Sequence, residues 1–203
     1  MQDKIDLFEH KSKSWDMEDR RIKNAKSIAD FIVKNISLSK KMEIIDFGAG
    51  TGLLSYFVAP YVGKIVAVDN SPSMLEKFKE KQTEFACDTE IIKGDLSAIA
   101  FEKKFDGIVS SMTMHHVEDI YALFSDFYKI LNDRGFIVIA DLDKEDGSFH
   151  TDNTGVHHYG FDRQLLETIA QNAGFKEITF ETASTIKKPH SDFTVFVMTA
   201  RKG

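Results

Sequence analysis

Short apolar runs alternate along the chain with stretches in which apolar residues recur every three or four positions. The runs are typical of strands buried on both faces, and the periodic stretches are typical of helices that pack on a sheet. Because the two patterns alternate, we expect crossover connections and a parallel sheet. The predicted strands of this sheet cover residues 42–47, 64–68, 89–92, 105–111 and 135–140.

Helical spacing fills the segments around these strands. The predicted helices cover residues 20–33, 53–59, 72–83, 118–131 and 162–173. Two of them have recognisable starts: Ser71 places a capping hydroxyl before Pro72, and Glu118 with Asp119 favours the positive end of a helix dipole. Residues 132–135, Asn-Asp-Arg-Gly, predict a turn into the fifth strand.

The whole pattern predicts a single α/β domain over residues 1–203, a Rossmann-like doubly wound sheet of about seven strands. It is mostly parallel, and two closing strands at 176–182 and 193–200 form an antiparallel C-terminal hairpin at its edge. Residues 1–18 are either frayed or a flap that a ligand orders. The chain then divides into an N-terminal flap and helix, a central core, a long loop, and a closing helix and hairpin, at 1–40, 41–140, 141–160 and 161–203.

The composition limits which classes of binding partner we expect. Lys and Arg number 26 against 32 Asp and Glu, so the formal charge of −6 opposes binding to nucleic acid and favours a small-molecule substrate. No apolar run approaches the roughly 18 residues of a membrane helix, so we expect no integral membrane association. The start of the chain lacks a secretory pattern and Cys87 is the single cysteine, so we expect a cytoplasmic protein. Nothing in the pattern predicts an oligomeric state.

Three glycines, Gly48, Gly50 and Gly52, follow the first predicted strand and permit positive φ and close approach of a ligand. A dinucleotide fingerprint needs Gly or Ala at position 53, which is Leu53, and no Gly-Lys-Ser/Thr follows, so a triphosphate-binding loop is excluded. Asp69 ends the second strand, 21 residues after Gly48, where an acidic residue binds ribose hydroxyls. The loop therefore favours a nucleoside ligand without a pyrophosphate.

Four motifs in this order resemble those of the class I S-adenosylmethionine-dependent methyltransferases. They are Asp46-Phe47-Gly48-Ala49-Gly50-Thr51-Gly52, Val68-Asp69-Asn70-Ser71-Pro72-Ser73-Met74-Leu75, Gly94-Asp95 and Phe105-Asp106-Gly107-Ile108-Val109. The segment from Phe8 to Trp15 and the run Met114-His115-His116-Val117 resemble the branch that includes quinone-biosynthesis (ubiquinone/menaquinone) methyltransferases. The resemblance implies S-adenosylmethionine as cofactor, S-adenosylhomocysteine as product, and methyl transfer to a small-molecule acceptor by in-line displacement.

The resemblance also implies a role for each residue that matches a motif. Gly48, Ala49 and Gly50 would lie against the methionine part of the cofactor, Asp46 would hold its amino group directly or through water, and Asp69 would bind both ribose hydroxyls. The other residues assigned to the cofactor are Asp95 for the adenine amino group, Asn70 and Leu96 beside the ring, and Ser111 and Met112 at the end of the fourth strand.

Each assignment has a structural alternative. Asp95 can cap the turn that follows it, Asp69 can cap the helix that opens at Pro72, and Asp46 can tie the glycine turn. Met112 and Met114 are equally typical of adaptable core filling.

An acceptor that is a hydroxyl or an acidic carbon needs a general base, for which histidine is suited near neutral pH. His115 and His116 follow the fourth strand at the carboxyl edge, where ligands bind in open α/β sheets. His157 and His158 lie in the 141–160 loop, which lines the acceptor pocket in the resembling family. We rank the candidates His116, His158, His157, His115. The alternative is that the first pair bonds to backbone and the loop pair faces solvent.

No metal site is predicted. Asp141, Asp143, Asp146 and Asp152 lie close together, but a calcium loop needs glycine at its sixth position and glutamate at its twelfth, which here are Asp146 and Asp152. Metal-assisted catechol methyltransferases place a carboxylate at the end of the fourth strand, where this chain has Ser111.

We expect Phe8, Trp15 and the 141–160 loop to form a lid over the acceptor. Two other functions stay open from the residues. One is a methyltransferase-like cofactor-binding or regulatory module without transfer activity. The other is a related nucleoside-cofactor alkyltransferase, for example an aminopropyl transferase.

Overall fold

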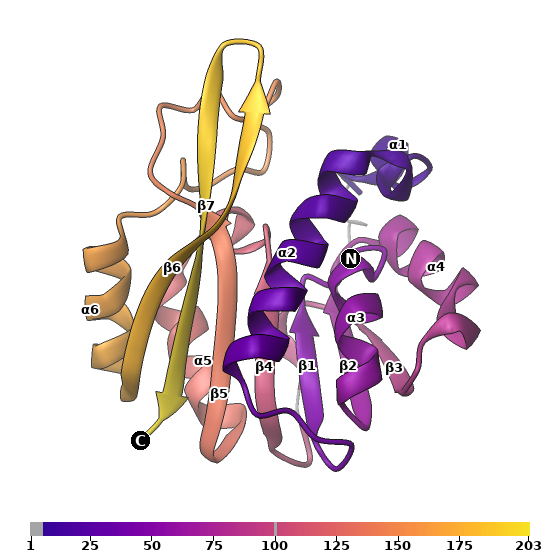
Figure 1. Cartoon of the computed structure of the whole chain (residues 1–203), viewed down its shortest axis with the longest axis vertical. Helices are drawn as coiled ribbons and strands as arrows, with labels where there is room; N and C mark the ends of the chain where they lie inside the picture. The colour runs from indigo at the N-terminus through magenta and orange to yellow at the C-terminus, as the bar shows by residue number, and fades with distance from the viewer. Residues whose placement is uncertain (1–5, 100) are drawn as a thin grey trace.

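The protein is described by a computed structural model that covers residues 6–99 and 101–203. Seven strands form one mixed sheet in the order β3-β2-β1-β4-β5-β7-β6 (Figure 1). All pairs are parallel except β5 with β7 and β6 with β7. The predicted fold class and the edge hairpin are therefore confirmed. The strands are β1 Glu43–Phe47, β2 Lys64–Asp69, β3 Asp88–Lys93, β4 Phe105–Ser111, β5 Leu131–Leu142, β6 Phe175–Lys188 and β7 Ser191–Lys202.

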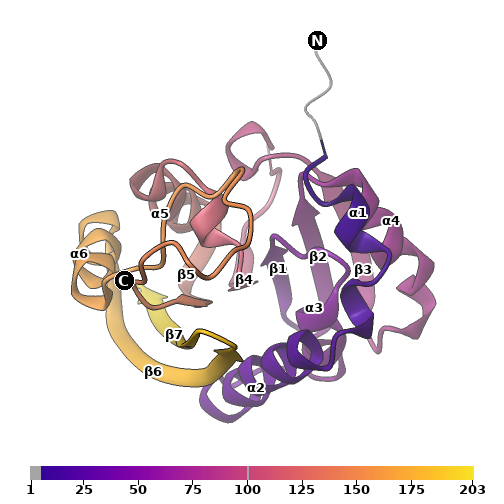
Figure 2. The same cartoon turned by 90° about the horizontal axis from the view of Figure 1, so that it is seen from above.

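Helices cover both faces of the sheet (Figure 2). The longer helices are α2 Asp19–Asn35, α3 Leu53–Val58, α4 Pro72–Glu80, α5 Ile120–Ile130 and α6 Arg163–Ala173. The apolar residues of α5 and α6 pack with one face of the central strands, and those of α2, α3 and α4 pack with the other. Alternate residues of β1 enter different clusters, as Ile44 and Ile45 do, because successive strand side chains point to opposite faces.

The short elements are α1 Glu9–Ser12 and the 3₁₀ turns η1 Trp15–Met17, η2 Ala59–Tyr61, η3 Gln82–Glu84, η4 Leu96–Ala98 and η5 Met114–His116. The described part of the N-terminal segment, residues 6–18, contains α1 and η1. The remaining residues of that predicted segment, 1–5, lie outside the described residues. No helix among the described residues is long and apolar enough to cross a lipid bilayer.

Local signals set most of the helix ends. The hydroxyl of Ser71 accepts a hydrogen bond from the Met74 amide at the start of α4, as the Ser-Pro pair predicts. Asp119 caps α5 in the same way through the amide of Ala122. Gly174 follows α6 with a φ of 105°, a left-handed conformation that closes the helix with little strain in glycine.

Two bounds differ from the sequence prediction. Residues 132–135, predicted as a turn, lie inside β5, although Arg134 has a φ of 61° and the pairing shifts between Phe105↔Leu131 and Gly107↔Phe136. The chain bends there without leaving the sheet. The first hairpin strand, predicted to end at 182, continues to Lys188 because backbone pairing with β7 persists after the apolar pattern has faded. Figure 1 shows this hairpin rising beyond the other strands.

Candidate functional site

The sheet has a switch point between β1 and β4. From β1 the chain winds outward to β2 and β3, and from β4 it winds the other way to β5. In open α/β sheets, ligands bind in the crevice at the carboxyl ends of the strands at such a point. The candidate residues end or follow these strands: Asp46, Gly48 and Gly50 at β1, Asp69 and Asn70 at β2, Asp95 and Leu96 after β3, and Ser111 and Met112 at β4.

The glycines of the loop after β1 have different surroundings. Gly48 has a φ of 68°, and a Cβ atom there would lie 2.1 Å from Cγ2 of Thr113, so close packing requires the glycine. Gly50 has a φ of 55°, and a Cβ atom there would meet nothing within 4 Å. Ala49, between them, is buried in the core on the α2 and α3 face. Gly50 is therefore the residue of this loop that faces open space.

Asp69 ties the glycine loop to the end of β2. One carboxylate oxygen accepts from the Gly50 amide at 2.7 Å, and the other accepts from the Ser71 amide at 2.8 Å. Burial raises the pKa of Asp69, while these backbone bonds oppose the rise. The cap of α4 is Ser71 and not Asp69, so the capping alternative for Asp69 is wrong.

Asp46 is buried at the end of β1. The Ser55 hydroxyl donates to Oδ2 of Asp46 at 2.5 Å, which links the strand to α3. Burial raises the pKa of Asp46 to about 7, and the nearby negative charge of Asp69 adds to the rise. Asp69, which bonds to the Gly50 amide, and Asp46, which interacts with Asp69, therefore both have raised pKa values, and a cationic ligand group beside them would offset unfavourable buried charge.

The residues assigned to adenine lie at the next two strand ends. Asn70 Nδ2 donates to Oδ1 of Asp95 at 3.2 Å, so the ends of β2 and β3 are joined. Leu96 is 5% exposed and packs in the core on the α5 face. The contact of these residues with an adenine ring stays a prediction.

The end of β4 is strained. Met112 has a φ of 56°, unusual for a residue with a side chain, and its amide donates to the Ala140 carbonyl at 2.8 Å. The Thr113 hydroxyl bonds to the carbonyls of Gly48 and Ser111, which fixes this segment against the glycine loop. Met112 is half-buried, whereas Met114 is fully buried in the core, so core filling is the role of Met114.

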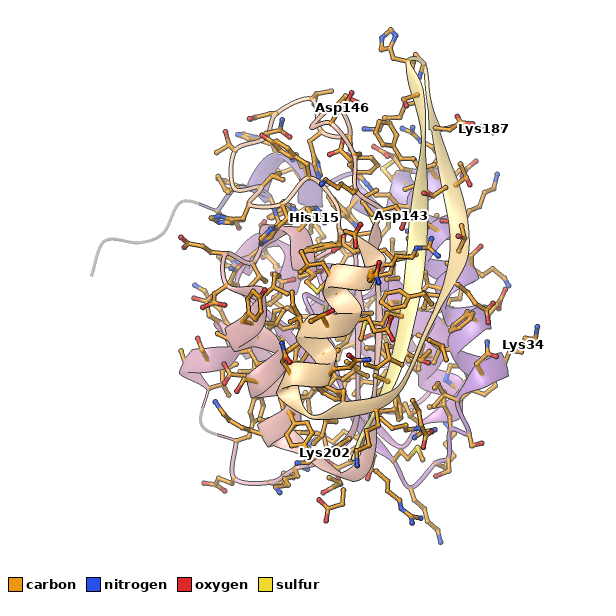
Figure 3. The ribbon with its side chains drawn as sticks, turned by 90° about the vertical axis from the view of Figure 1, so that its left-hand side faces the viewer. Lys34, His115, Asp143, Asp146, Lys187 and Lys202 are labelled. Carbon is orange, nitrogen blue, oxygen red and sulfur yellow. The ribbon has the colours of Figure 1, made fainter. Side chains whose placement is uncertain are left out.

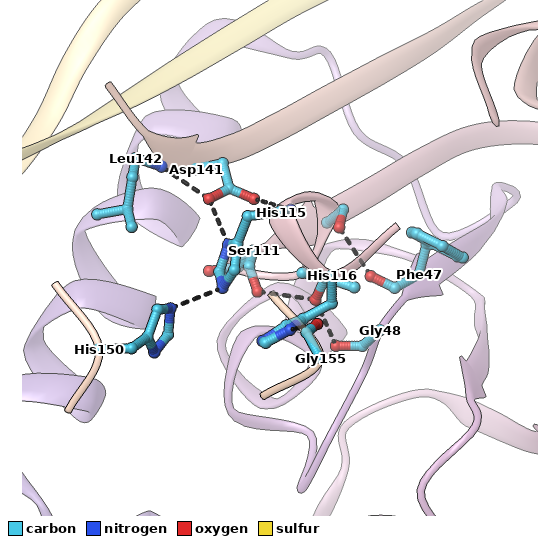
Figure 4. A network of polar contacts seen from close by, with 11 residues as sticks. Phe47, Gly48, Ser111, His115, His116, Asp141, Leu142, His150 and Gly155 are labelled. Atoms are coloured by element: carbon cyan, nitrogen blue, oxygen red, sulfur yellow. Dashed lines mark hydrogen bonds and ion pairs between the residues drawn. The ribbon is translucent and has the colours of Figure 1, made fainter. Parts of the chain in front are cut away.

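His115 forms a buried pair with Asp141 at the end of β5. The ring Nδ1 of His115 lies 2.7 Å from Oδ1 of Asp141, and the two side chains are 1% and 0% exposed (Figure 4). Burial by itself lowers the pKa of His115, but the carboxylate outweighs it and the pKa is raised. The Asp141 oxygens also accept from the amides of His115 and Leu142.

Two further histidines lie beside this pair. His116 places Nδ1 at 2.7 Å from the Gly155 carbonyl, and its ring meets Phe8 edge-on at 5.5 Å. Nε2 of His150 lies 3.2 Å from Nε2 of His115. Burial lowers the pKa of both His116 and His150 to about 4, helped by the neighbouring histidines, so both rings are neutral at pH 7.

Among the contacts of the described residues, the rings of the loop pair named from the sequence do not meet the rings of this group, although the backbone amides of both residues donate to the His115 carbonyl. His158 Nε2 donates to the Val117 carbonyl at 2.9 Å, and its ring packs beside Phe161. His157 is exposed, and its amide donates to the carbonyl of His115. Of the first pair, the His116 ring bonds to a backbone carbonyl, as the alternative has it, whereas the His115 ring bonds to the Asp141 side chain. Of the loop pair, His157 is exposed, but His158 is partly buried and bonded to backbone. Sequence reasoning missed His150, whose only signal is its place in the 141–160 loop.

The expected lid segments cover this edge. Phe8 packs against Trp15, with ring centroids 6.0 Å apart, and contacts the ring of His116. Asp6 accepts from Ser71 and Ser73 at the start of α4. Figure 1 places α1 above α4 at the same end of the sheet as the glycine loop.

A second anchor of the flap is Asp16. It accepts from the Thr51 hydroxyl of the glycine loop at 2.5 Å and pairs with Lys81. The 141–160 loop is held from the other side, where Lys188 of β6 donates to the Phe149 carbonyl and lies 4.0 Å from the centre of that ring.

The four aspartates of this loop region do not act as one group. Asp143 pairs with Arg163 through both carboxylate oxygens, and Asp146 and Asp152 accept from nearby loop amides. Figure 3 shows Asp143 and Asp146 at different heights of this region. Asp141 alone of the four bonds to a histidine ring in the contacts above.

Two surface hollows lie elsewhere. One is formed by α2, α3 and the segment around Glu84, and the other lies beside α5 and α6 around Glu118 and Phe161. Neither is lined by the glycine loop, Asp46, Asp69 or the group of His115, His116 and His150. The chemistry is concentrated at the strand ends rather than in these hollows.

Comparison with known proteins supports the same view. A family model described as a methyltransferase domain matches residues 44–135. An uncharacterized methyltransferase of Schizosaccharomyces pombe is 33% identical over 158 residues, which are 70% of this chain and 56% of that protein. A ubiquinone biosynthesis O-methyltransferase of Pelagibacter ubique is 29% identical over 120 residues, 58% of this chain and 49% of that protein. The chain thus spans about half the length of these relatives.

A solved structure has the same fold. In the complex between the Haloferax volcanii Trm112 methyltransferase activator and a methyltransferase, the matched chain has a TM-score of 0.77 and 16% identity. The match covers 100% of this chain and 99% of that one. Residues 44–135 thus match a methyltransferase domain, and the relatives and the fold support a class I S-adenosylmethionine-dependent methyltransferase.

Proposed function

We propose that the protein transfers a methyl group from S-adenosylmethionine to a small-molecule acceptor by in-line displacement. The observation that carries the proposal is the open space at Gly50, whose amide bonds to the buried Asp69, with the buried Asp46 close enough to Asp69 for their charges to interact. The cofactor's ammonium group compensates the charge of Asp46. Asp69 keeps lone pairs for the ribose hydroxyls, because each carboxylate oxygen accepts more than one hydrogen bond.

The remaining cofactor residues are proposed from their positions at the strand ends. Asp95 binds the adenine amino group, Asn70 and Leu96 flank the ring, and Ser111 and Met112 line the cofactor at the end of β4. The strained backbone of Met112 fits this role, because such conformations gather at ligand sites. Methyl transfer needs mainly alignment of nucleophile, methyl carbon and sulfur, and such positioning supplies roughly 7 to 11 kcal/mol of a barrier.

On the acceptor side, we propose that His116 and its neighbours face the substrate under the lid of Phe8, Trp15 and the 141–160 loop. The contacts of Phe8 with His116 and of the loop with the histidines support this choice over His157 and His158. The ubiquinone biosynthesis relative supports a small-molecule acceptor.

Calorimetric titration with S-adenosylhomocysteine tests the cofactor claim, and one binding event per chain is expected. Incubation with S-adenosylmethionine and a panel of phenols, carboxylic acids and amines, followed by mass spectrometry, tests transfer. Gain of a methyl group by a panel member supports the enzyme. Cofactor binding without transfer to any acceptor favours the regulatory module, and alkylation by decarboxylated cofactor alone favours aminopropyl transfer.

A further inference from the structure

Three histidines converge beneath the lid. One ring nitrogen each from His115, His116 and His150 lies within 4.8 Å of the others. Among the described residues, this is the only group of three or more His, Cys, Asp or Glu side chains close enough to hold a metal ion. Figure 4 shows the rings of His115 and His150 turned toward each other, with His116 beside them. The three come from η5 and from a loop far along the chain.

Their hydrogen bonds direct the lone pairs of two of these rings. The Gly155 carbonyl only accepts, so Nδ1 of His116 carries the proton and Nε2 carries the lone pair. The carboxylate of Asp141 likewise holds the proton of His115 on Nδ1 and leaves the lone pair on Nε2, the nitrogen that faces Nε2 of His150. A carboxylate or carbonyl behind each imidazole is the usual support of a metal-binding histidine.

The spacing fits a transition metal after a small movement. Zinc binds histidine nitrogen at roughly 2.0 to 2.1 Å, so two nitrogens of a tetrahedral site lie about 3.3 Å apart. Nε2 of His115 and Nε2 of His150 are already 3.2 Å apart. Since the limit for the whole group is 4.8 Å, the third nitrogen has to approach by about 1.5 Å at most, within reach of a side-chain rotation.

The surroundings fix two of the ligands and leave the third adjustable. His115 is buried and held by Asp141, which accepts amide bonds at the end of β5. The neighbour of His150, Phe149, packs edge-on against the His150 ring and against Phe193 of β7. The third ligand, His116, has to approach the other two, and its ring contacts Phe8 of the N-terminal lid segment.

We propose that His115, His116 and His150 bind a divalent transition-metal ion of the zinc class, with Asp141 orienting His115. Three imidazoles favour such an ion over magnesium or calcium, which prefer oxygen ligands. Three protein ligands leave a fourth position open, as in sites where a metal holds water or a substrate atom. That position binds an oxygen or sulfur atom of the acceptor, and this role alone rests on the proposed methyl transfer.

The test uses the full chain without a polyhistidine tag, stripped with chelator and dialysed. Titration calorimetry with Zn²⁺ is expected to give one ion per chain, and Co²⁺ is expected to give the visible absorption of a four-coordinate site. His150→Ala should weaken Zn²⁺ binding at least tenfold. The matched control is His190→Ala, which removes an exposed histidine in the β6–β7 turn and should bind like the wild type.

Asp141→Asn is the second variant, because it keeps the shape of the buried side chain. Loss of a supporting carboxylate typically weakens metal binding 10- to 100-fold, so a loss in that range is expected. Absence of Zn²⁺ binding by the wild type, or equal binding by His150→Ala and the wild type, overturns the proposal. Titration of the same samples with S-adenosylhomocysteine separates the two claims, because failure of cofactor binding counts against the proposed function and not against the metal site.

Discussion

The two sides of the crevice are built in different ways. On the cofactor side, Asp46 and Asp69 lie in the last two residues of β1 and β2, and Gly50 follows β1 by three residues. Asp69 bonds to the backbone amides of Gly50 and Ser71. On the acceptor side, the contact between His115 and His150 joins residues 35 positions apart, and that between His116 and Gly155 joins residues 39 positions apart. One side is local in sequence and the other depends on how a long loop returns to the sheet.

Their electrostatics also differ in sign. Burial raises the pKa values of the carboxyl groups of Asp46 and Asp69, so the cofactor side resists negative charge. Burial lowers the pKa values of His116 and His150, so the acceptor side resists positive charge until something offsets it. The same physical cause, removal of water, therefore prepares one side for a cationic ligand and keeps imidazole lone pairs free on the other.

The largest expected effect concerns the buried charge of Asp46. Its pKa is about 7 in the folded protein against 3.8 for an ordinary Asp, a difference of roughly 4 kcal/mol at most. Below about pH 4 the carboxyl is neutral in both states. Stability falls as the pH rises from about 4 to about 7, because the unfolded chain ionises Asp46 while the folded protein keeps it neutral, and the fall is complete above about pH 7. Asp46→Asn should therefore unfold at a higher temperature than the wild type at pH 8, without cofactor, as measured by differential scanning fluorimetry.

The control for Asp46→Asn is the same pair of proteins at pH 4, where the difference in melting temperature should shrink. The variant should also bind S-adenosylhomocysteine at least tenfold more weakly, since the amide cannot offset an ammonium charge. A stability difference independent of pH contradicts the assignment of a raised pKa to Asp46.

The second effect separates two glycines of one loop. Gly48→Ala should cost about 3 kcal/mol of folding free energy, because left-handed backbone strain adds to a Cβ atom placed against Thr113. Gly50→Ala should cost only about 1 kcal/mol from backbone strain, since its Cβ faces open space. Urea unfolding measures both. Calorimetry should show that Gly50→Ala, although it folds stably, binds S-adenosylhomocysteine more weakly than the wild type. An equal stability cost in both variants contradicts the different surroundings assigned to Gly48 and Gly50.

The third effect tests the ribose role of Asp69. Asp69→Ala removes hydrogen bonds to a charged group, each worth about 1.5 to 3 kcal/mol, so affinity for S-adenosylhomocysteine should fall at least tenfold. Asp88→Ala is the matched control, because Asp88 is exposed and begins β3, at the opposite edge of the parallel sheet. If Asp69→Ala binds S-adenosylhomocysteine as tightly as the wild type, Asp69 does not bind the ribose hydroxyls.

The smallest effect is expected across the crevice. His116→Ala should change affinity for S-adenosylhomocysteine by less than about twofold, because its contacts are with Gly155 and Phe8 and distant sites act nearly independently. Calorimetry on His116→Ala beside Asp69→Ala gives the direct contrast. A tenfold loss in His116→Ala means that the cofactor and acceptor sides are one coupled site.

Much of the fold follows from short-range patterns. The apolar runs predict every strand of the sheet, and Ser71 and Asp119 predict helix starts that the structure confirms. The extension of β6 to Lys188 was not predictable in this way, because it depends on pairing with β7 and not on its own residues. The bend at Arg134 resembles a turn in sequence and becomes part of β5 through its neighbour β4.

The residues of the candidate site likewise fall into those that the sequence predicts and those that only tertiary contacts bring together. By itself the sequence determined the acids and glycines at the ends of β1 and β2, because a strand end fixes where the next few residues lie. Only the tertiary structure decided that His150 joins His115 and that Asp141 stands behind them, because a loop position is set by its contacts with distant backbone. Here those contacts are the bonds of Gly155 and His157 to the η5 histidines, and they turn separate residues into one group.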